Sequence, residues 1–283
     1  MGAAVSLAAL LIGTAAYAES AAGKGVHGAT RVVAADSHGD KTAAPPHGNP
    51  SGHGSGWSYQ GVNGPDRWGS LSRDYAACGR GTTQSPIDLS GKAPAGTTNG
   101  DIRFDYRLTP VRILNNGHTV QVNYTEGSAM TVEARTFKVL QFHFHAPSEH
   151  AIDGRLADME MHIVHKNDAG ELAVVGVLMN VGKENLALRE VWQNLPNGVS
   201  AEKVNERDLV NARDFLPPDA KYFRYMGSLT TPPCSEGVNW FVMDEPMEVS
   251  AEQVALFSRS VGANNRPLQA VNNRLLLAPN KVN

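Results

Sequence analysis

Apolar and polar residues alternate along much of the middle of this chain, which is the pattern of half-buried β-strands. Turn-forming runs such as Asn115-Asn116-Gly117 and Asn167-Asp168-Ala169-Gly170 separate several of these segments. Short strands joined by tight turns favour a mainly antiparallel sheet. The segments predicted as strands are Val111–Leu114, Thr119–Thr125, Val139–His145, Met159–His165 and Leu172–Val181.

Helical periodicity is confined to two short segments. Asn185–Leu195 places Leu188 and Trp192 on one helix face, and a second helix is predicted after Ser250, where Gln253 completes a capping-box pattern. We therefore expect a mainly β (α+β) fold. It would be a single domain around a large, mostly antiparallel, twisted central sheet with short helices at its periphery.

The first 18 residues have the features of a signal peptide. Val5–Ala16 is an apolar run, and Ala16-Tyr17-Ala18 is a small-residue cleavage pattern, which predicts cleavage after Ala18 and a periplasmic or secreted protein. No Lys or Arg precedes the run, so a buried helix or an uncleaved anchor is the alternative. No later stretch is a membrane-span candidate, and none is expected in the mature chain.

Residues 19–56 are rich in Ala, Gly, Ser, Thr and Pro and contain almost no large apolar side chains. Such a segment cannot bury enough surface to offset its ordering entropy, which predicts a disordered linker. Its irregularly spaced histidines fit a solvated linker better than a metal-collecting tract. Residues 57–283 keep a globular composition without a second linker or a repeat, which predicts one domain.

Composition and charge narrow the class of protein. Hydrophobic residues make up 41% of the 283 residues, enough for one sizeable core, and the formal net charge is −3. No basic stripe points to a nucleic-acid partner. The even cysteine count, Cys78 and Cys234, favours a disulfide behind a signal peptide, whereas in a cytosolic protein these would be two unrelated thiols.

The segment from Gln141 to His145 carries the most informative pattern. Alternate residues of a strand share a face, so Gln141, His143 and His145 point one way, and Leu140, Phe142 and Phe144 point to the core. The two imidazoles would lie about 7 Å apart, within reach of a common metal ion. On the second strand, Glu160, His162 and Val164 share a face, so His162 can complete the set.

Three neutral imidazoles suit zinc and leave a fourth position open for water. A His-x-His pair on a strand is a weak signal by itself, because two hydrogen-bonded surface histidines give the same pattern. His150 and His165 are alternative third ligands. His162 is preferred because His165 falls on the other strand face and His150 follows Pro147, beyond the predicted strand.

Several separate motifs resemble the signature segments of the α-class carbonic anhydrases, in the family's order and at plausible spacings. The resemblance extends from Trp57 to about Arg274, nearly the whole globular part. The motifs are Gln141-Phe142-His143-Phe144-His145, Ser148-Glu149-His150, Glu160-Met161-His162, Gly227-Ser228-Leu229-Thr230-Thr231-Pro232-Pro233, Trp57-Ser58-Tyr59, Asn63-Gly64-Pro65, Gln84-Ser85-Pro86 and Asn115-Asn116-Gly117-His118.

The resemblance implies a zinc enzyme that interconverts carbon dioxide and bicarbonate. His143, His145 and His162 would be the ligands, Gln141 and Glu160 would orient His143 and His162, and a backbone carbonyl near Asn264 would orient His145.

The resemblance also implies how hydroxide at the zinc is aimed at its substrate. Thr230 would accept a hydrogen bond from that hydroxide and donate its own proton to Glu149, which positions the nucleophile. Thr231 would line the same anion site. The open zinc position would also admit a sulfonamide.

An apolar wall for carbon dioxide and a route for the proton follow from the same resemblance. The wall would consist of Val164, Val174, Leu229, Val238 and Trp240. His118 would be the proton shuttle, since a histidine with a pKa near 6.5 can pass a proton to buffer. The residues that would order the intervening water molecules are Tyr59, Asn116 and Gln121.

Rival interpretations come from other classes of protein. A recognition domain would have lost a zinc ligand, yet His143, His145, His162, Thr230 and Glu149 are all present. Ester cleavage would be a side activity, because no carboxylic acid is placed for a leaving group. A metal buffer acting through residues 19–56 would lose its function with that segment. The sequence leaves a monomer and a homodimer both open.

Overall fold

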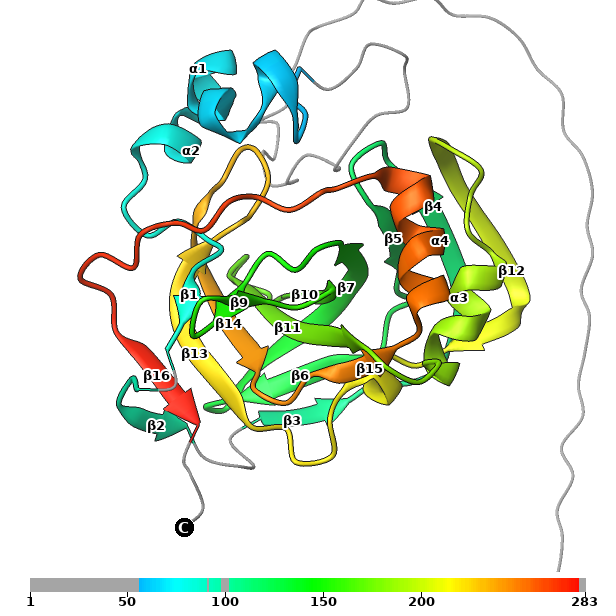
Figure 1. Ribbon diagram of the computed structural model, residues 1–283. Coiled ribbons are helices and arrows are strands. Elements are labelled where there is room, and N and C mark those ends of the chain that lie inside the picture. The colour runs from blue at the N-terminus through cyan, green and yellow to red at the C-terminus, as the bar shows by residue number, and fades with distance from the viewer. Residues whose placement is uncertain (1–55, 91, 98–101, 280–283) are drawn as a thin grey trace, which may run out of the picture. The chain divides into compact units, whose positions relative to one another are not determined.

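A 13-stranded sheet is the framework of the computed structural model, which describes residues 56–90, 92–97 and 102–279 (Figure 1). The predicted signal peptide and almost all of the predicted linker lie outside these residues. Along the sheet the strands follow the order β12 (Ser200–Val210), β4 (Thr109–Asn115), β5 (Val120–Asn123), β7 (Arg135–His145), β10 (Met159–Lys166), β11 (Leu172–Val181), β14 (Glu236–Met243), β13 (Tyr222–Ser228), β16 (Leu276–Pro279) and β2 (Ala95–Thr97).

Smaller elements complete the sheet and its surroundings. Strand β15 (Met247–Val249) pairs with β11, and β6 (Ala129–Val132) pairs with both β3 (Ile102–Asp105) and β7. A separate three-stranded sheet contains β1 (Asp88–Leu89), β8 (Ala151–Ile152) and β9 (Arg155–Leu156). The α-helices are α1 (Trp68–Leu71), α2 (Ala76–Arg80), α3 (Arg189–Gln193) and α4 (Ala251–Val261), and 3₁₀ turns cover Gly61–Asn63, Pro65–Arg67, Arg73–Tyr75, Leu186–Leu188 and Ala212–Phe215.

The expected fold class is confirmed: antiparallel pairs predominate among the described strands, and the helices are short. All five predicted strands are present, and so are both predicted helical segments. Ser250 caps α4 by accepting from the backbone N–H of Gln253, whose side chain reaches back to the N-cap backbone. One pairing matters for the site: β11 runs parallel to β14, which brings Trp240 beside Val174.

The central strands separate two hydrophobic layers. Strands β10 and β11 are buried on both faces, as their nearly continuous apolar sequences require. On one face Phe142, Phe144 and Met161 belong to a large core that also contains Trp192 of α3 and Phe257 of α4. The other face carries a smaller apolar cluster and the candidate site.

The prediction that Leu140 belongs to the core with Phe142 and Phe144 is wrong. Leu140 is 41% exposed, whereas Phe142 and Phe144 are fully buried. The register shows why: His165 pairs with Val139 and Val164 pairs with Gln141, so β7 holds one extra residue at a β-bulge. The bulge reverses the alternation of buried and exposed side chains before Gln141 and leaves it unchanged after Gln141.

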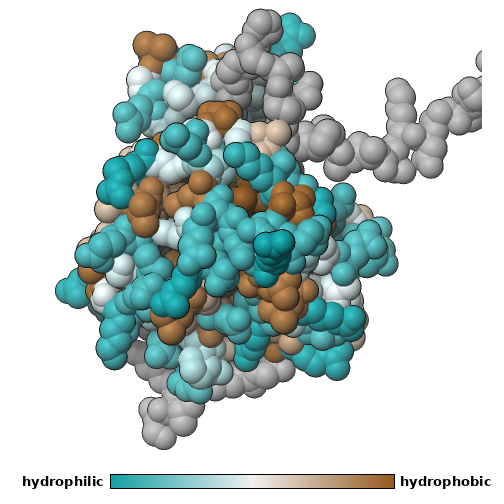
Figure 2. Space-filling model, turned by 90° about the vertical axis from the view of Figure 1, so that its right-hand side faces the viewer, coloured by the Kyte–Doolittle hydropathy of each residue, from teal (hydrophilic) through white to brown (hydrophobic). Residues whose placement is uncertain are grey.

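The outer surface carries its apolar residues in separate places. On the face in Figure 2, hydrophilic residues surround several small hydrophobic patches. Among the described helices, none has the length and apolar character needed to cross a membrane. All described residues belong to one compact unit.

Candidate metal centre

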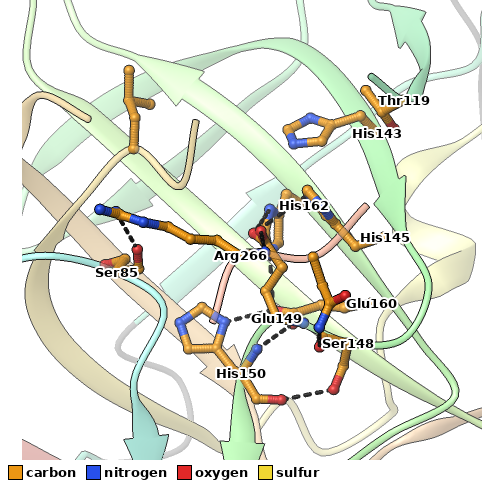
Figure 3. A network of polar contacts seen from close by, with 12 residues as sticks. Ser85, Thr119, His143, His145, Ser148, Glu149, His150, Glu160, His162 and Arg266 are labelled. Atoms are coloured by element: carbon orange, nitrogen blue, oxygen red, sulfur yellow. Dashed lines mark hydrogen bonds and ion pairs between the residues drawn. The ribbon is translucent and has the colours of Figure 1, made fainter. Parts of the chain in front are cut away.

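Three histidines converge from two neighbouring strands. His143 and His145 lie on β7, and His162 on β10 is the direct cross-strand partner of His143. Their ring centroids are 4.6 to 5.3 Å apart, and one nitrogen of each ring lies within 4.8 Å of the others. His145 and His162 are buried, and His143 is half-buried. The two-residue alternation of the strands therefore brings the three predicted ligands together (Figure 3).

An oxygen acceptor fixes each imidazole ring. The Nδ1 of His143 lies 2.9 Å from Oε1 of Gln141, the Nδ1 of His145 lies 2.8 Å from the backbone carbonyl of Asn264, and the Nε2 of His162 lies 2.8 Å from Oε1 of Glu160. A carbonyl or carboxylate oxygen only accepts, so these ring nitrogens carry the hydrogen. The second nitrogen of each ring is the one with a lone pair for a metal.

The inner side of the centre contains a buried nitrogen that needs a partner. Among the described residues, no group hydrogen-bonds to Nε2 of His145, although this atom is buried. Burial lowers the pKa of His145 to about 4, despite the hydrogen bond to Asn264, and it also lowers the pKa of His162. Neutral, oriented imidazoles with inward lone pairs fit Zn²⁺, which is the ion that three histidines and one open position suit best.

The two alternative histidines have both ring nitrogens engaged elsewhere. His150 contacts Oε1 of Glu160 at 2.7 Å and the hydroxyl of Tyr225 at 2.6 Å. His165 contacts the Tyr106 hydroxyl at 2.7 Å and the Ala173 carbonyl at 3.2 Å. His150, Glu160 and His162 are also close enough to hold a metal, but hydrogen bonds among them account for that proximity.

Glu160 is held by four N–H groups. Its Oε1 accepts from the rings of His150 and His162, and its Oε2 accepts from the backbone N–H of Glu149 and of His150, both at 2.8 Å. Burial raises the pKa of Glu160, but His150 and His162 outweigh it and hold the pKa well below its usual value. An ionised, saturated carboxylate fixes the ring of His162 rigidly.

Glu149 faces the same centre from beyond the end of β7. Its Oε2 lies 3.6 Å from Nε2 of His145 and 3.9 Å from Nδ1 of His162, and its Oε1 accepts from the backbone N–H of Arg266 at 2.9 Å. Burial raises the pKa of Glu149 to about 7, and His162 and a hydrogen-bonding contribution from Thr230 oppose that rise. No described group meets strict hydrogen-bond geometry at Oε2. A cation among the histidines would favour the ionised carboxylate.

The predicted apolar wall lies next to the histidines. Val164, Val174, Val238 and Trp240 are buried in one cluster, and Leu229 packs against it. Cross-strand pairing continues from Val164 through Val174 to Trp240, and the indole of Trp240 lies 4.8 Å from the ring of His162.

The Thr230–Thr231 segment is tied to the N-terminal helices. Thr230 is buried, and Thr231 accepts from the backbone N–H of Cys234. Cys234 forms a disulfide with Cys78 of α2, as the cysteine count predicted.

At the outer end of the predicted proton path, His118 packs against an aromatic ring and Asn116 shapes a turn. The ring of His118 stacks on Trp57, with centroids 3.6 Å apart and planes 11° apart, and burial lowers its pKa. The side-chain oxygen of Asn116 accepts from the backbone N–H groups of His118 and Thr119, so it shapes the turn. Tyr59 has a buried hydroxyl with no partner among the described residues.

Sequence reasoning missed two features of the site. Arg266 is 2% exposed, lies over the Trp68 ring, and donates to the Cys78 and Ser85 carbonyls and to Gln84. Its position in the polar run Asn264-Asn265-Arg266 gave no sign of burial. The chain from Glu160 through His150 and Tyr225 to Ser85 was also missed, because its members are far apart in sequence.

A centre of three histidines with a neighbouring apolar wall fits the site of a mononuclear zinc enzyme. The model of the eukaryotic-type carbonic anhydrase family matches residues 63–280. The carbonic anhydrase of Nostoc sp. is 43% identical over 224 residues, covering 78% of this chain and 85% of that protein. The chain belongs to the eukaryotic-type, or α-class, carbonic anhydrase family.

Solved structures agree with this assignment. The α-carbonic anhydrase of Thermovibrio ammonificans, in complex with the inhibitor sulfanilamide, superposes with a TM-score of 0.75 at 40% identity and covers 78% of this chain and 98% of its own. Dioscorin complexed with ascorbate gives a TM-score of 0.74 at 32% identity, covering 80% and 98%. The fold is therefore shared with a protein described by a different name and ligand.

Proposed function

We propose that this chain catalyses the reversible hydration of carbon dioxide to bicarbonate, with Zn²⁺ held by His143, His145 and His162. The observation that most supports this proposal is that an oxygen acceptor fixes the outer N–H group of each of the three rings. When bound, zinc supplies a nucleophile at neutral pH by acidifying water, for which carbonic anhydrase is the standard example.

The residues around the centre orient that nucleophile. The Thr230 hydroxyl donates a hydrogen bond to one carboxylate oxygen of Glu149. The other oxygen of Glu149 already accepts from the backbone N–H of Arg266. Thr230 Oγ1 is then left with lone pairs only, so it accepts a hydrogen bond from the nucleophile and sets its direction. Thr231 lines the anion site beside it.

Different residues bind the substrate and carry the proton. Val164, Val174, Leu229, Val238 and Trp240 provide the apolar surface against which carbon dioxide lies. His118 takes up a proton at its imidazole from water ordered by Tyr59, Asn116 and Gln121, and it passes the proton to buffer. The ring of His118 is fixed by stacking on Trp57 yet only partly buried, which supports this role.

Variants at two positions test these assignments. His162→Ala should lose both bound zinc and carbon dioxide hydration, measured by elemental analysis and stopped flow. Thr230→Val should keep one zinc per chain and lose activity by about 100-fold, because only the orientation of the nucleophile is removed. A zinc-loaded wild type without hydration activity would instead indicate a binding module.

The open metal position should also bind aromatic sulfonamides, as the Thermovibrio relative does with sulfanilamide. We further propose that residues 1–18 direct export and are removed after Ala18, that residues 19–56 link the leader to the catalytic domain at 57–283, and that the enzyme works in the periplasm or outside the cell. N-terminal sequencing of the secreted protein tests the cleavage, and sedimentation distinguishes a monomer from a homodimer.

A further inference from the structure

Polar side chains continue outward from the histidines along one row of cross-strand partners. Gln121 on β5 is the partner of His143, and Asn123 is the partner of Gln141. Asn123 pairs in turn with Arg112 on β4, and β4 pairs with the edge strand β12 (Figure 1). Residues two apart on a strand share a face, so this row runs from the metal centre to the edge of the sheet.

A continuous chain of hydrogen bonds follows the row. Gln121 Nε2 donates to Asn123 Oδ1, Asn123 Nδ2 donates to Glu202 Oε2, and Arg112 donates to Glu202 Oε1, each at 2.6 Å. The side chains of Arg112 and Glu202 are 36% and 27% exposed, so the ion pair is partly shielded from solvent. Both carboxylate oxygens of Glu202 are thus engaged.

The charge at the outer end fixes the direction of every bond in the chain. An amide can present either its oxygen or its NH₂ group, whereas a carboxylate only accepts. Asn123 must therefore turn its NH₂ group to Glu202 and its oxygen to Gln121. Gln121 must in turn present its own NH₂ group to Asn123. Its carbonyl oxygen is then left for water, since Gln121 and its cross-strand partner His143 are both only partly buried.

We propose that Glu202 is a positioning residue for proton transfer, acting through Asn123 to keep the Gln121 carbonyl oxygen turned toward water beside His143. This role rests on the proposed proton path from the metal centre to His118. A carbonyl oxygen accepts from water, while an NH₂ group donates to it. The orientation of Gln121 therefore sets the direction of the first hydrogen bonds along that path.

Exchanging the charges of Arg112 and Glu202 should reverse the direction of the hydrogen bonds that Asn123 and Gln121 make. In the double variant Arg112→Glu with Glu202→Arg, the ion pair remains, but the introduced guanidinium only donates, so Asn123 and then Gln121 must rotate. In weak buffer, kcat for carbon dioxide hydration should fall about fivefold, the rate equivalent of one misdirected hydrogen bond. The ratio kcat/KM should change by less than about twofold, since it reports steps up to bicarbonate release.

The same exchange in a Gln121→Leu background is the control. Gln121→Leu itself should lower kcat, and the exchange should then have no further effect. An equally large further fall in that background, or equal falls in kcat and kcat/KM, would overturn the role of Glu202. If the double variant does not fold, Glu202→Gln should lower kcat by about twofold in the same direction, since it removes only the charge.

The side-chain amide of Asn123 gives a readout independent of activity. In ¹⁵N-labelled, zinc-loaded protein, Glu202→Gln should shift the Asn123 NH₂ resonances, because their charged acceptor is lost. Unchanged resonances would refute the hydrogen-bond chain itself. An inactive wild type with shifted resonances would refute the proposed function and leave the chain intact.

Discussion

Replacing His165 tests whether this buried histidine has a structural role and is not a metal ligand. It lies on the same strand as His162 but on the opposite face. The ring of His165 is fully buried, with the Ala173 carbonyl at one nitrogen and the Tyr106 hydroxyl at the other. The carbonyl only accepts, so Nδ1 donates to it and Nε2 accepts from Tyr106. Protonating Nε2 would force the Tyr106 hydroxyl to rotate from donor to acceptor, and it would bury a charge. His165→Asn should therefore keep one zinc per chain, lower the stability at neutral pH and remove the pH dependence that this ring causes.

The magnitude follows from the pKa of His165. Burial lowers this pKa from its ordinary 6.5 to about 4. The unfolded chain then binds a proton more readily than the folded chain, so stability is lost as the pH falls from 6.5 toward 4. At about 1.4 kcal/mol per pKa unit, the loss is about 2 kcal/mol at pH 5 and about 3 kcal/mol below pH 4.

Urea unfolding of zinc-loaded, disulfide-intact protein at pH 7, 6 and 5 measures this loss. His165→Asn should be less stable than wild type by about 2 kcal/mol at pH 7, and the gap should close as the pH falls. Tyr106→Phe is the control, because it removes the partner but leaves a titratable ring and hence the pH dependence. A constant gap at all three pH values, or loss of zinc from His165→Asn, would refute the reasoning.

Three further predictions concern the site and its supports. His118→Ala should lower kcat in weak buffer by at least about 10-fold, with little change in kcat/KM and rescue by imidazole; equal falls without rescue would make His118 structural. Gly176→Ala should weaken zinc binding by about 10-fold in a chelator competition, because its Cβ would lie 3.0 Å from Oε1 of Glu160; unchanged affinity would mean that Glu160 does not need that space. Reducing the Cys78–Cys234 disulfide, which spans 156 residues, should cost up to about 5 kcal/mol of unfolding free energy, and two free thiols in the exported protein would contradict the bond.

Local alternation predicted that the three histidines converge, because two neighbouring strands carry all of them. His143 and His145 are two apart, and a shared face follows from strand geometry alone. The same rule failed at Leu140, since a β-bulge is a property of the pairing between two strands and leaves no periodic trace in either one.

Groups that depend on long-range packing could not be predicted in this way. The burial of Arg266 depends on Cys78, Gln84 and Ser85, which lie 181 to 188 positions away in the sequence. Glu202 belongs to a charged edge strand whose sequence resembles an exposed surface. Glu202 is connected to the site through its hydrogen bond from Asn123, a residue two strands away in the sheet.

The order in which the parts of the site are synthesised follows from their places along the chain. The three histidines proposed as ligands fall within 20 consecutive residues, on strands that pair directly. Arg266, in contrast, holds Glu149 across 117 positions and the Cys78 carbonyl across 188. A growing chain therefore contains all three proposed metal ligands before it contains Arg266, which fixes the proposed orienting residue Glu149. The pairing of β7 and β10 brings the proposed ligands together, whereas the proposed orientation of the reaction also needs Arg266, far beyond both strands along the chain.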